Sequence, residues 1–416
     1  MRYRITKPEH VLKGEISLPS SKSVTNRLLI IRALTKEPFV INNISDSDDT
    51  NVLLNAIETV NSKISNTIDV GPAGTSMRFL TAYLSRSNSE YILTGSERMK
   101  NRPISKLVDA LRAMGAQIEY LEKGGFPPLK ITGCDLQGGE VLVDSSISSQ
   151  FTSALLMIAP TLPKGLILKM RNKMVSSSYI WLTLKLMENF GVKYTWTGET
   201  IEIPSQKYVA KDVTVEGDWS AASYWYEMAA LADDADFVIR GLFNNSMQGD
   251  ARIAELFDSI GVGTEYIEGG IKLYKKKISC KFFEYDFIEN PDMVQTFAVT
   301  LCNLGIPFKF TGTESLKIKE TDRIEAVIAE LKKLGFKLES PNPDILSWDG
   351  NYEIKRQTVE IETYDDHRMA MAFAPAAIKH DLVIHEPLVV NKSYPCFWLD
   401  LKKAGFEIQN YIPGNL

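Results

Sequence analysis

The chain has 416 residues, of which 44% are apolar and 24% charged, so it can bury a large core and is too long for one ordinary domain. Its 47 basic and 52 acidic residues give a net charge of −5, which argues against a general affinity for nucleic acid or for anionic membrane surfaces. An anionic ligand must therefore meet locally clustered lysine and arginine side chains.

The first residues, Met1 to Leu18, read as polar and then strand-like, without the basic and apolar regions of an export signal. The sequence also lacks a run of about 18 apolar residues that could span a membrane. We therefore expect a cytoplasmic protein without a membrane span. Its four cysteines and four histidines lack the spacing of metal ligands, so we expect no metal site.

The first segment that could carry chemistry is residues 18–27 (LPSSKSVTNR), which leave a strand and enter a helix predicted over residues 24–34. Serine hydroxyls and backbone N–H groups at the helix start, with Lys22 and Arg27 beside them, favour binding of a phosphate or carboxylate. The alternative interpretation is a helix cap with surface charges.

Two further segments follow in the first third of the chain. Residues 70–78 (VGPAGTSMR) are rich in glycine, and Thr75 is placed to cap the next helix, but the spacing is not that of a P-loop or a dinucleotide fingerprint. Residues 98–103 (RMKNRP) place three cations before a helix predicted over residues 104–114, where they oppose the helix dipole. Such cations need either solvent or an anion.

Serine clusters precede two later helices. Residues 144–150 (DSSISSQ) lead into an apolar helix over residues 151–158, and residues 176–179 (SSSY) lead into another. Hydroxyl groups at helix starts can bind phosphate without a charge of their own. Simple capping is the alternative.

The segment 317–323 (KIKETDR) precedes a helix whose capping box explains its aspartate. The box does not explain Lys319, Glu320 and Arg323, because two cations near a helix start again need an anion. Glu320 between them is expected to stay ionised and ready for proton transfer.

The last candidate segments are residues 364–371 (YDDHRMAM) and 390–395 (VNKSYP). His367 follows two aspartates and could be an oriented acid or base, and Arg368 could bind an anion. A single histidine is more often a structural residue, so this interpretation stays open.

One pattern recurs along the chain: an amphipathic helix, a glycine where the helix needs a left-handed terminating residue, and then an alternating strand. The glycines recur at intervals of roughly 70 residues, and they are Gly115, Gly191, Gly261, Gly335 and Gly405. A shortened earlier copy is expected over residues 51–64, with Asn61 in the role of the glycine. We expect an α/β protein of six such units, three in each of two domains. Ordinary α/β alternation is the competing interpretation.

The order of these segments resembles the whole length of the 5-enolpyruvylshikimate-3-phosphate (EPSP) synthase family. The stretches that match are residues 19–27, 73–78, 98–103, 148–150, 215–218, 245–250, 291–292, 318–323, 366–371 and Lys392. The resemblance implies an inside-out α/β barrel of six βαβαββ repeats in two domains, with the first repeat shortened. One domain would span residues 18–216 and the other residues 1–17 plus 217–416, with the active site in the interdomain cleft.

The resemblance also implies that the chain transfers the enolpyruvyl group of phosphoenolpyruvate to shikimate 3-phosphate, as a monomer without metal or organic cofactor. The residues that would bind shikimate 3-phosphate are Lys22, Ser23, Arg27, Ser148, Ser149, Gln150, Ser176, Tyr179, Asp292, Ser315 and Lys319. Those for phosphoenolpyruvate are Lys22, Gly74, Thr75, Arg102, Gln150, Arg323, Arg368 and Lys392. Lys22, Asp292, Glu320, Lys392 and His367 are the catalytic candidates.

Three positions depart from the family's pattern. Pro72 and Ser315 stand where asparagine is frequent, and Phe79 stands where proline is frequent. These changes concern ligand affinity more than reaction class. Pro72 removes a side-chain amide, so we expect weakened inhibition by glyphosate, which in this family competes with phosphoenolpyruvate.

Two other functions compete with this interpretation. The related transferase family that acts on UDP-N-acetylglucosamine has asparagine after the first lysine and usually a loop cysteine, whereas here Ser23 follows Lys22 and residues 1–133 contain no cysteine. A non-catalytic anion-binding protein would not need Lys22, Asp292 and Glu320 together.

Overall fold

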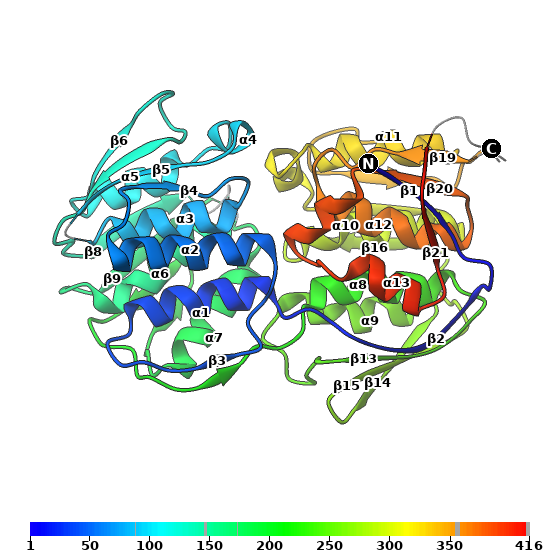
Figure 1. The fold of residues 1–416 in the computed structure, drawn as a ribbon, viewed down its shortest axis with the longest axis horizontal. Coiled ribbons are helices and arrows are strands. Elements are labelled where there is room, and N and C mark those ends of the chain that lie inside the picture. Colours follow the sequence, from blue (N-terminus) through cyan, green and yellow to red (C-terminus); the bar gives the residue numbers. More distant parts are fainter. Residues whose placement is uncertain (88, 145–147, 173, 354–357, 413–416) are drawn as a thin grey trace. The chain divides into compact units, whose positions relative to one another are not determined.

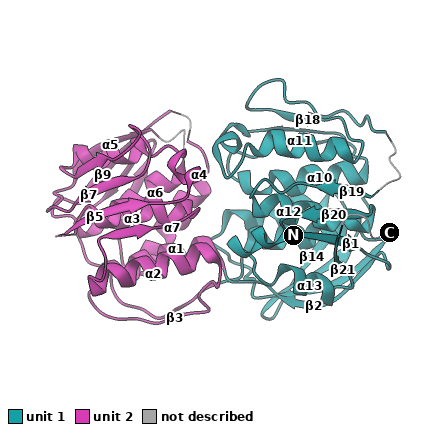
Figure 2. Ribbon diagram, turned by 45° about the horizontal axis from the view of Figure 1, so that its top comes forward, with its two compact units in different colours: residues 1–20, 216–416 teal, residues 21–215 magenta. Residues whose placement is uncertain are grey.

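The structure is a computed structural model that describes residues 1–87, 89–144, 148–172, 174–353 and 358–412. The chain forms two compact units (Figure 2), which we call unit 1 (residues 1–20 and 216–416) and unit 2 (residues 21–215). Residues 18–20 and Glu216, which the sequence analysis assigned to the domain starting at residue 18, belong to unit 1. Among the described residues we find no helix with the length and apolar character that a membrane crossing requires.

Unit 2 alternates helices and strands along its length. Its elements are α1 (Lys22–Leu34), β3 (Ile41–Asn42), α2 (Asp48–Ser62), β4 (Thr67–Asp69), α3 (Gly74–Leu84), β5 (Glu90–Thr94), α4 (Glu97–Lys100), α5 (Ser105–Ala113), β6 (Gln117–Tyr120), β7 (Leu129–Thr132), β8 (Gly139–Asp144), α6 (Ser149–Ile158), η1 (Ala159–Thr161), β9 (Leu166–Arg171), α7 (Ser177–Asn189), β10 (Thr195–Thr197), β11 (Thr200–Ile203) and β12 (Val213–Thr214). Here η denotes a 3₁₀ helix.

Unit 1 begins with the two N-terminal strands and resumes after unit 2. Its elements are β1 (Arg2–Thr6), β2 (Val11–Ser17), α8 (Trp219–Leu231), β13 (Asp234–Arg240), η2 (Gly249–Arg252), α9 (Ile253–Asp258), β14 (Val262–Ile267), β15 (Gly270–Lys275), β16 (Phe283–Asp286), η3 (Pro291–Met293), α10 (Val294–Leu304), β17 (Phe308–Thr311), η4 (Glu314–Ile318), α11 (Arg323–Lys333), β18 (Leu346–Trp348), β19 (Val359–Ile361), α12 (His367–Phe373), η5 (Ala374–Ile378), β20 (Leu382–His385), η6 (Pro387–Lys392), α13 (Phe397–Lys403) and β21 (Glu407–Asn410).

The strands pair in one recurring order. In unit 2, the sheet β4-β5-β7-β6 has a parallel first pair and antiparallel remaining pairs. The sheet β8-β9-β11-β10 repeats this arrangement, and in unit 1 the sheets β2-β13-β15-β14 and β19-β20-β1-β21 do so as well. The copy β16-β17-β18 has three strands within the described residues. The copy with α1 and α2 keeps only the parallel pair β3 and β12, which is the predicted shortened repeat.

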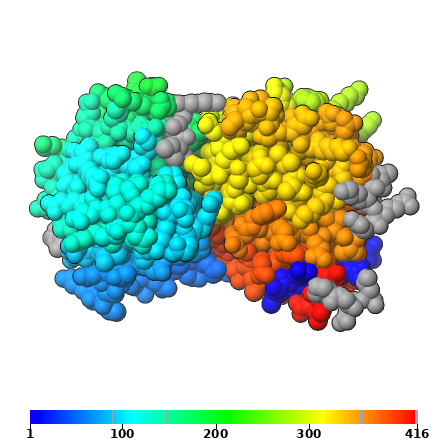
Figure 3. Space-filling model, turned by 90° about the horizontal axis from the view of Figure 1, so that it is seen from above, coloured from blue at the N-terminus to red at the C-terminus, as the bar shows by residue number. Residues whose placement is uncertain are grey.

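The N-terminal strands complete sheets whose other strands come much later in the chain. β2 lies parallel to β13, and β1 lies antiparallel between β20 and β21. The first and last described residues therefore adjoin on the surface of unit 1 (Figure 3). The sequence predicted that the N-terminal strand belongs with the second half of the chain.

The helices form the interior of each unit, and the sheets lie outside them. Every residue of α8 except Ser220 is buried, and so is every residue of α6 except Gln150. A helix that is buried on all sides must be surrounded by other elements. Figure 1 shows β13, β14 and β15 on the outer side of α8 and α9. This arrangement confirms the predicted inside-out α/β fold. Among the described residues, none of the six sheets closes on itself.

The five recurring glycines take the predicted left-handed conformation. Their φ angles are 103° (Gly115), 81° (Gly191), 102° (Gly261), 103° (Gly335) and 85° (Gly405). The prediction for Asn61 is wrong, because α2 continues to Ser62 and Lys63 ends the helix with a φ of 54°. Lys63 is exposed, so its side chain extends into solvent while the backbone turns.

One buried carboxyl group in the core of unit 1 leads to a prediction about stability. Glu227 of α8 is fully buried, neither carboxyl oxygen has a hydrogen-bond partner in the described part of the chain, and burial raises the pKa of this carboxyl well above its usual value. Glu227→Met is expected to raise the free energy of unfolding by about 1–3 kcal/mol at neutral pH. The reason is that an apolar side chain of similar size replaces an unsatisfied polar group. Urea unfolding at a series of pH values measures this.

The pH dependence has a definite sign. Because the folded pKa of Glu227 is raised, its stabilising contribution is complete below the unfolded pKa of about 4.3 and is lost as the pH rises toward the folded value. The gain from Glu227→Met should therefore grow with pH above about 4.3. Glu255→Met, at a side chain 79% exposed, is the matched control and should leave stability nearly unchanged. A gain that does not grow with pH would show that Glu227 is ionised in the folded protein.

Candidate active site

In unit 2, the helix start predicted to bind an anion surrounds a buried arginine. Arg27 of α1 is 2% exposed and donates to Thr183 Oγ1 at 2.7 Å, to Ser153 Oγ at 3.2 Å and to the Ser23 carbonyl at 2.8 Å. Burial lowers the pKa of Arg27 to about 10. In the described part of the chain no carboxylate forms an ion pair with Arg27, so this buried cation has only neutral partners. An anionic ligand would supply the missing charge.

Lys22 forms an ion pair that the sequence analysis missed. Its Nζ lies 3.0 Å from Oδ2 of Asp49, and the two side chains are only 15% and 5% exposed. Asp49 lies in the first turn of α2, where a carboxylate also stabilises the helix dipole. Aspartates at this point of the sequence indicate a helix start, but the sequence gives no sign that Asp49 pairs with Lys22.

Gly74 lies directly against Arg102. A Cβ atom added at Gly74 would be 2.6 Å from Arg102 Nη1, so only glycine leaves room for the guanidinium. Arg78 holds both segments, because it donates to the Gly74 carbonyl at 3.2 Å and to the Pro103 carbonyl at 3.1 Å. The structure thus brings together two segments that the sequence analysis treated separately.

Thr75 does not cap a helix, and that prediction is wrong. Helix α3 begins one residue earlier, at Gly74, and its N-cap is Ala73, which makes no side-chain capping bond. The Thr75 hydroxyl instead accepts a hydrogen bond of 3.2 Å from the Gln150 amide. Gln150 therefore lies beside the start of α3, next to Gly74.

The serine clusters differ in what they do. Ser148 is the N-cap of α6, with its hydroxyl accepting from the Gln150 N–H at 3.3 Å, and Ser149 is buried. Ser176 is the N-cap residue of α7, but it has a φ of 57° and makes no side-chain capping bond. Tyr179 lies with its ring 5.7 Å from the Arg27 guanidinium carbon. Residues 145–147 of the first cluster lie outside the described residues.

In unit 1, Arg323 joins three carboxylates. The side chain is 2% exposed and lies at the first residue of α11, after the N-cap Asp322. It donates to Asp366 Oδ2 at 2.7 Å, to Asp292 Oδ1 at 2.8 Å and to Glu320 Oε2 at 3.0 Å. Burial alone would lower the pKa of Arg323, but these three carboxylates raise it above its usual value.

Two further cations complete this cluster. Arg368 Nη2 lies 2.9 Å from Asp292 Oδ2, and Lys392 Nζ lies 2.9 Å from Glu320 Oε1. Burial would raise the pKa of Asp292, but the charges of Arg368, Lys319 and Arg323 hold it well below its usual range. We call Asp292, Glu320, Arg323, Arg368 and Lys392 the unit 1 charge cluster. Lys319 follows η4, which contains the buried Ser315.

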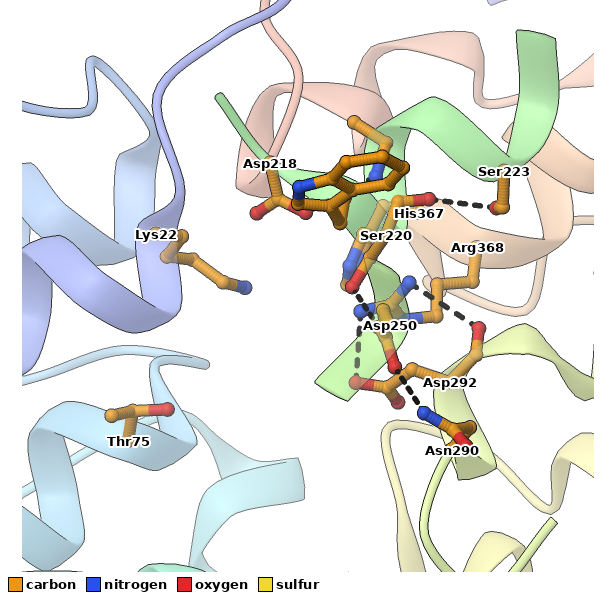
Figure 4. Close-up of polar contacts among 12 residues, drawn as sticks. Lys22, Thr75, Asp218, Ser220, Ser223, Asp250, Asn290, Asp292, His367 and Arg368 are labelled. Atoms are coloured by element: carbon orange, nitrogen blue, oxygen red, sulfur yellow. Dashed lines mark hydrogen bonds and ion pairs between the residues drawn. The ribbon is translucent and has the colours of Figure 1, made fainter. Parts of the chain in front are cut away.

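Figure 4 shows a further carboxylate, Asp250, beside this cluster. Asp250 accepts hydrogen bonds from the Ser220 hydroxyl and, at 3.1 Å, from the Asn290 amide. Two residues after Asn290, Asp292 binds Arg368. Burial and the charge of Asp292 raise the pKa of Asp250. These bonds fix Asn290, which precedes the turn η3 that carries Asp292.

His367 lies beside the cluster, and its neighbour Asp366 contacts Arg323 and Arg368 directly. His367 is 2% exposed, with Nδ1 3.7 Å from Asp366 Oδ1. Asp366 is the N-cap of α12, accepts from the Arg368 N–H at 2.9 Å and binds Arg323. The sequence analysis noted Asp366 only as a neighbour of His367, because a capping aspartate gives no sign of a distant arginine.

Comparison with known proteins shows the family of this chain. A profile of EPSP synthase (3-phosphoshikimate 1-carboxyvinyltransferase) matches residues 6–67 and 55–401. A 3-phosphoshikimate 1-carboxyvinyltransferase of Bacteroides fragilis is 52% identical over 412 residues, covering 98% of this chain and 99% of the relative. The chain belongs to the EPSP synthase family. A further relative of the same name from Photobacterium profundum is 37% identical and covers 94% of this chain and 96% of its own length.

Solved structures share the fold at low sequence identity. An EPSP synthase from Acinetobacter baumannii superposes with a TM-score of 0.76 at 22% identity, covering 98% of this chain and all of that one. The enolpyruvyl transferase NikO from Streptomyces tendae gives 0.74 at 16% identity, covering 98% of each chain. The fold is therefore common to enolpyruvyl transferases. The full-length sequence identity to EPSP synthases does not favour the UDP-N-acetylglucosamine alternative.

Proposed function

We propose that this chain transfers the enolpyruvyl group of phosphoenolpyruvate to the 5-hydroxyl of shikimate 3-phosphate and releases phosphate. The observation that carries the proposal is that each unit of this family member contains buried cations at positions suited to anionic ligands. Within the described residues, Arg27 of unit 2 is a buried cation with only neutral partners, and the unit 1 charge cluster places arginines and a lysine against two carboxylates. Anion binding and proton transfer both need such groups.

The residue assignments follow the chemistry of each substrate. The groups assigned to shikimate 3-phosphate are Lys22, Ser23, Arg27, Ser148, Ser149, Gln150, Ser176, Tyr179, Asp292, Ser315 and Lys319. Those assigned to phosphoenolpyruvate are Lys22, Gly74, Thr75, Arg102, Gln150, Arg323, Arg368 and Lys392. The contacts of Arg27 with Tyr179, of Gly74 with Arg102 and of Thr75 with Gln150 support these groupings within unit 2.

The reaction requires one acid, one base and several cations. The attacking hydroxyl loses a proton while the methylene carbon gains one and becomes a methyl group, giving a tetrahedral ketal phosphate. This intermediate then expels phosphate as the methyl group loses a proton, which restores the enol double bond. We assign proton transfer at the methylene carbon to Glu320 and Lys22. We assign removal of the hydroxyl proton to Asp292, with Lys392 assisting. Arg102, Arg323 and Arg368 would stabilise the carboxylate and the departing phosphate. His367, whose Nδ1 lies 3.7 Å from Asp366 Oδ1, stays a catalytic candidate in this proposal.

Asp292 is a weak base in the absence of substrate, because Arg323 and Arg368 both donate to it. A substrate that brings a carboxylate and a phosphate to the same two arginines competes for their positive charge. The pKa of Asp292 would then rise toward its usual value, since the ion pairs are what depress it. Substrate binding would thereby activate the base.

The proposal includes a cytoplasmic monomer that needs no metal or organic cofactor. The reaction is addition and elimination at an enol carbon, for which charged side chains suffice. Light scattering of the purified chain tests the monomer, and turnover in the presence of a metal chelator tests metal independence.

The proposed activity is tested by following phosphate release. The chain is mixed with phosphoenolpyruvate and either shikimate 3-phosphate or UDP-N-acetylglucosamine as the acceptor. We expect release only with shikimate 3-phosphate. Release with the UDP-sugar alone would transfer the assignment to the other family, and release with neither acceptor would favour a non-catalytic anion-binding protein.

Pro72 predicts a change in inhibition by glyphosate. It lies in the exposed turn before α3, after Gly71, whose N–H donates to Asp69 Oδ1 at 2.8 Å. Asparagine at this position could donate a hydrogen bond to a charged ligand beside Gly74, worth roughly 1.5–3 kcal/mol or about 10- to 150-fold in affinity. Pro72→Asn should therefore lower the inhibition constant for glyphosate. Pro38→Asn, at another exposed proline of unit 2, is the control. Equal inhibition constants in all three proteins would exclude the hydrogen-bond explanation.

A further inference from the structure

The segment that leads into α12 has an unusual backbone. Tyr364 and Asp365 both have a φ of 55°, so two consecutive residues with side chains take the left-handed conformation. This conformation is unfavourable for residues with a Cβ atom, and most of all for bulky ones such as tyrosine. Such a turn persists only where surrounding contacts hold it. The turn lies directly before Asp366, which binds Arg323, and Arg368, which belongs to the unit 1 charge cluster.

A buried carboxylate contacts both this turn and the backbone before it. Glu330 of α11 is fully buried, and its Oε1 accepts a hydrogen bond of 2.7 Å from the Tyr364 hydroxyl. Its Oε2 accepts from the Glu362 N–H at 3.1 Å and from Lys333 Nζ at 2.6 Å. A charged acceptor makes each of these bonds stronger than a bond between neutral groups. Glu330 therefore fixes both the side chain of Tyr364 and the backbone two residues before it.

The same helix contacts the segment at a second point. Arg323 begins α11, and Glu330 lies about two turns later on the same helix. Arg323 binds Asp366 at 2.7 Å, and the Asp366 side chain accepts from the Arg368 N–H at 2.9 Å. Helix α11 thus holds residues 362–366 at both ends of the left-handed turn. The turn therefore determines the position of Asp366 relative to Arg323. It also determines where α12 begins, and so the position of Arg368 relative to Asp292.

We propose that Glu330 and Tyr364 are a positioning pair for the reaction. Their hydrogen bond stabilises the left-handed turn at residues 364–365 and so places Asp366 and Arg368 for binding of phosphoenolpyruvate. Neither side chain touches the substrate in this proposal. The inference rests on the proposed function, which gives Arg323 and Arg368 their role in binding phosphoenolpyruvate.

The test begins with Tyr364→Phe, which removes only the hydroxyl. We expect the KM for phosphoenolpyruvate to rise about 10-fold, because one hydrogen bond to a charged group is lost. The KM for shikimate 3-phosphate and the midpoint of thermal unfolding should stay within about twofold and about 3 °C of the wild type. Tyr352→Phe, at a side chain 58% exposed in the same unit, is the matched control and should change nothing.

A rescue variant separates positioning from a general structural role. Glycine takes the left-handed conformation without strain, so Asp365→Gly reduces the need for the Tyr364 bond. Adding Asp365→Gly to Tyr364→Phe should restore most of the affinity for phosphoenolpyruvate. An unchanged KM in Tyr364→Phe, or an equal rise in both KM values with no rescue, would overturn the proposal.

Hydrogen exchange gives a readout that does not depend on turnover. The Glu362 amide is bonded to Glu330, so the amides of residues 362–368 should exchange faster in Tyr364→Phe and return toward the wild-type rate in the double variant. Unchanged exchange would contradict the pair. If the wild-type chain shows no turnover, the proposed function fails, and the exchange rates alone then decide for or against the pair.

Discussion

Glu320→Gln is expected to lower kcat by about 10²-fold or more while changing both substrate KM values only slightly. The carboxylate lies between two cations, with Oε1 2.9 Å from Lys392 Nζ and Oε2 3.0 Å from Arg323 Nη2. Glutamine keeps the shape and one acceptor but cannot give or take a proton. Because Glu320 is assigned to proton transfer, the loss should fall on the chemical step. Steady-state kinetics with each substrate varied in turn measures this separation.

Glu314→Gln is the matched control, since Glu314 is an exposed carboxylate in η4, close to Glu320 in the sequence. It should keep the wild-type kcat. If Glu320→Gln also keeps the wild-type kcat, Glu320 has no part in proton transfer. A large rise in KM at constant kcat would make Glu320 a binding residue instead.

Arg323→Met is expected to reduce the free energy of unfolding by about 3–5 kcal/mol at neutral pH and to abolish measurable turnover. Arg323 is 2% exposed and donates to Asp292, Glu320 and Asp366. Removing it leaves three carboxylates close together with fewer cations to balance them. Urea unfolding measures the first effect, and phosphate release measures the second. Arg252→Met, at a side chain 58% exposed in the same unit, is the control.

The stability loss in Arg323→Met should depend on pH. The folded pKa of Asp292 is depressed in the wild type, so its stabilising contribution is present above the unfolded value of about 3.9 and is lost as the pH falls through the folded value. In the variant, protonation relieves the repulsion among the carboxylates. The gap between wild type and variant should therefore be widest near neutral pH and narrow below about pH 4. A gap that stays constant as the pH falls well below about 4 would mean that lost packing, and not lost charge compensation, destabilises the variant.

The repeated architecture could be predicted because it is encoded locally. A glycine after an amphipathic helix is needed wherever the chain turns with a left-handed residue, and Gly115 and Gly335, each with a φ of 103°, show this in both units. The end of α2 could not be predicted from the same rule. Lys63 takes the left-handed conformation there, at an exposed position where a lysine side chain is tolerated.

The sequence singled out the cations of the site because arginine and lysine beside a helix start need a compensating charge, and their role in substrate binding stays a prediction. Their protein partners could not be predicted. Asp49 lies 27 positions from Lys22 in the sequence, and Asp366 lies 43 positions from Arg323. Both aspartates lie at helix starts, where capping or the helix dipole already explains them, so the sequence gives no sign of a second role. Glu330 is similar, because a glutamate within a helix reads as a solvated residue although this one is fully buried.

The most direct test of the proposed reaction is to run it in D₂O and examine the product by proton NMR. Addition at the methylene carbon takes up one solvent deuteron to form a methyl group, and elimination of phosphate then removes one hydrogen isotope from that group. We therefore predict that the enolpyruvyl group on shikimate 3-phosphate carries deuterium at its methylene carbon and that one phosphate is released for each product molecule. A product without deuterium at that carbon, or phosphate released without any enolpyruvyl product, would contradict enolpyruvyl transfer by addition and elimination.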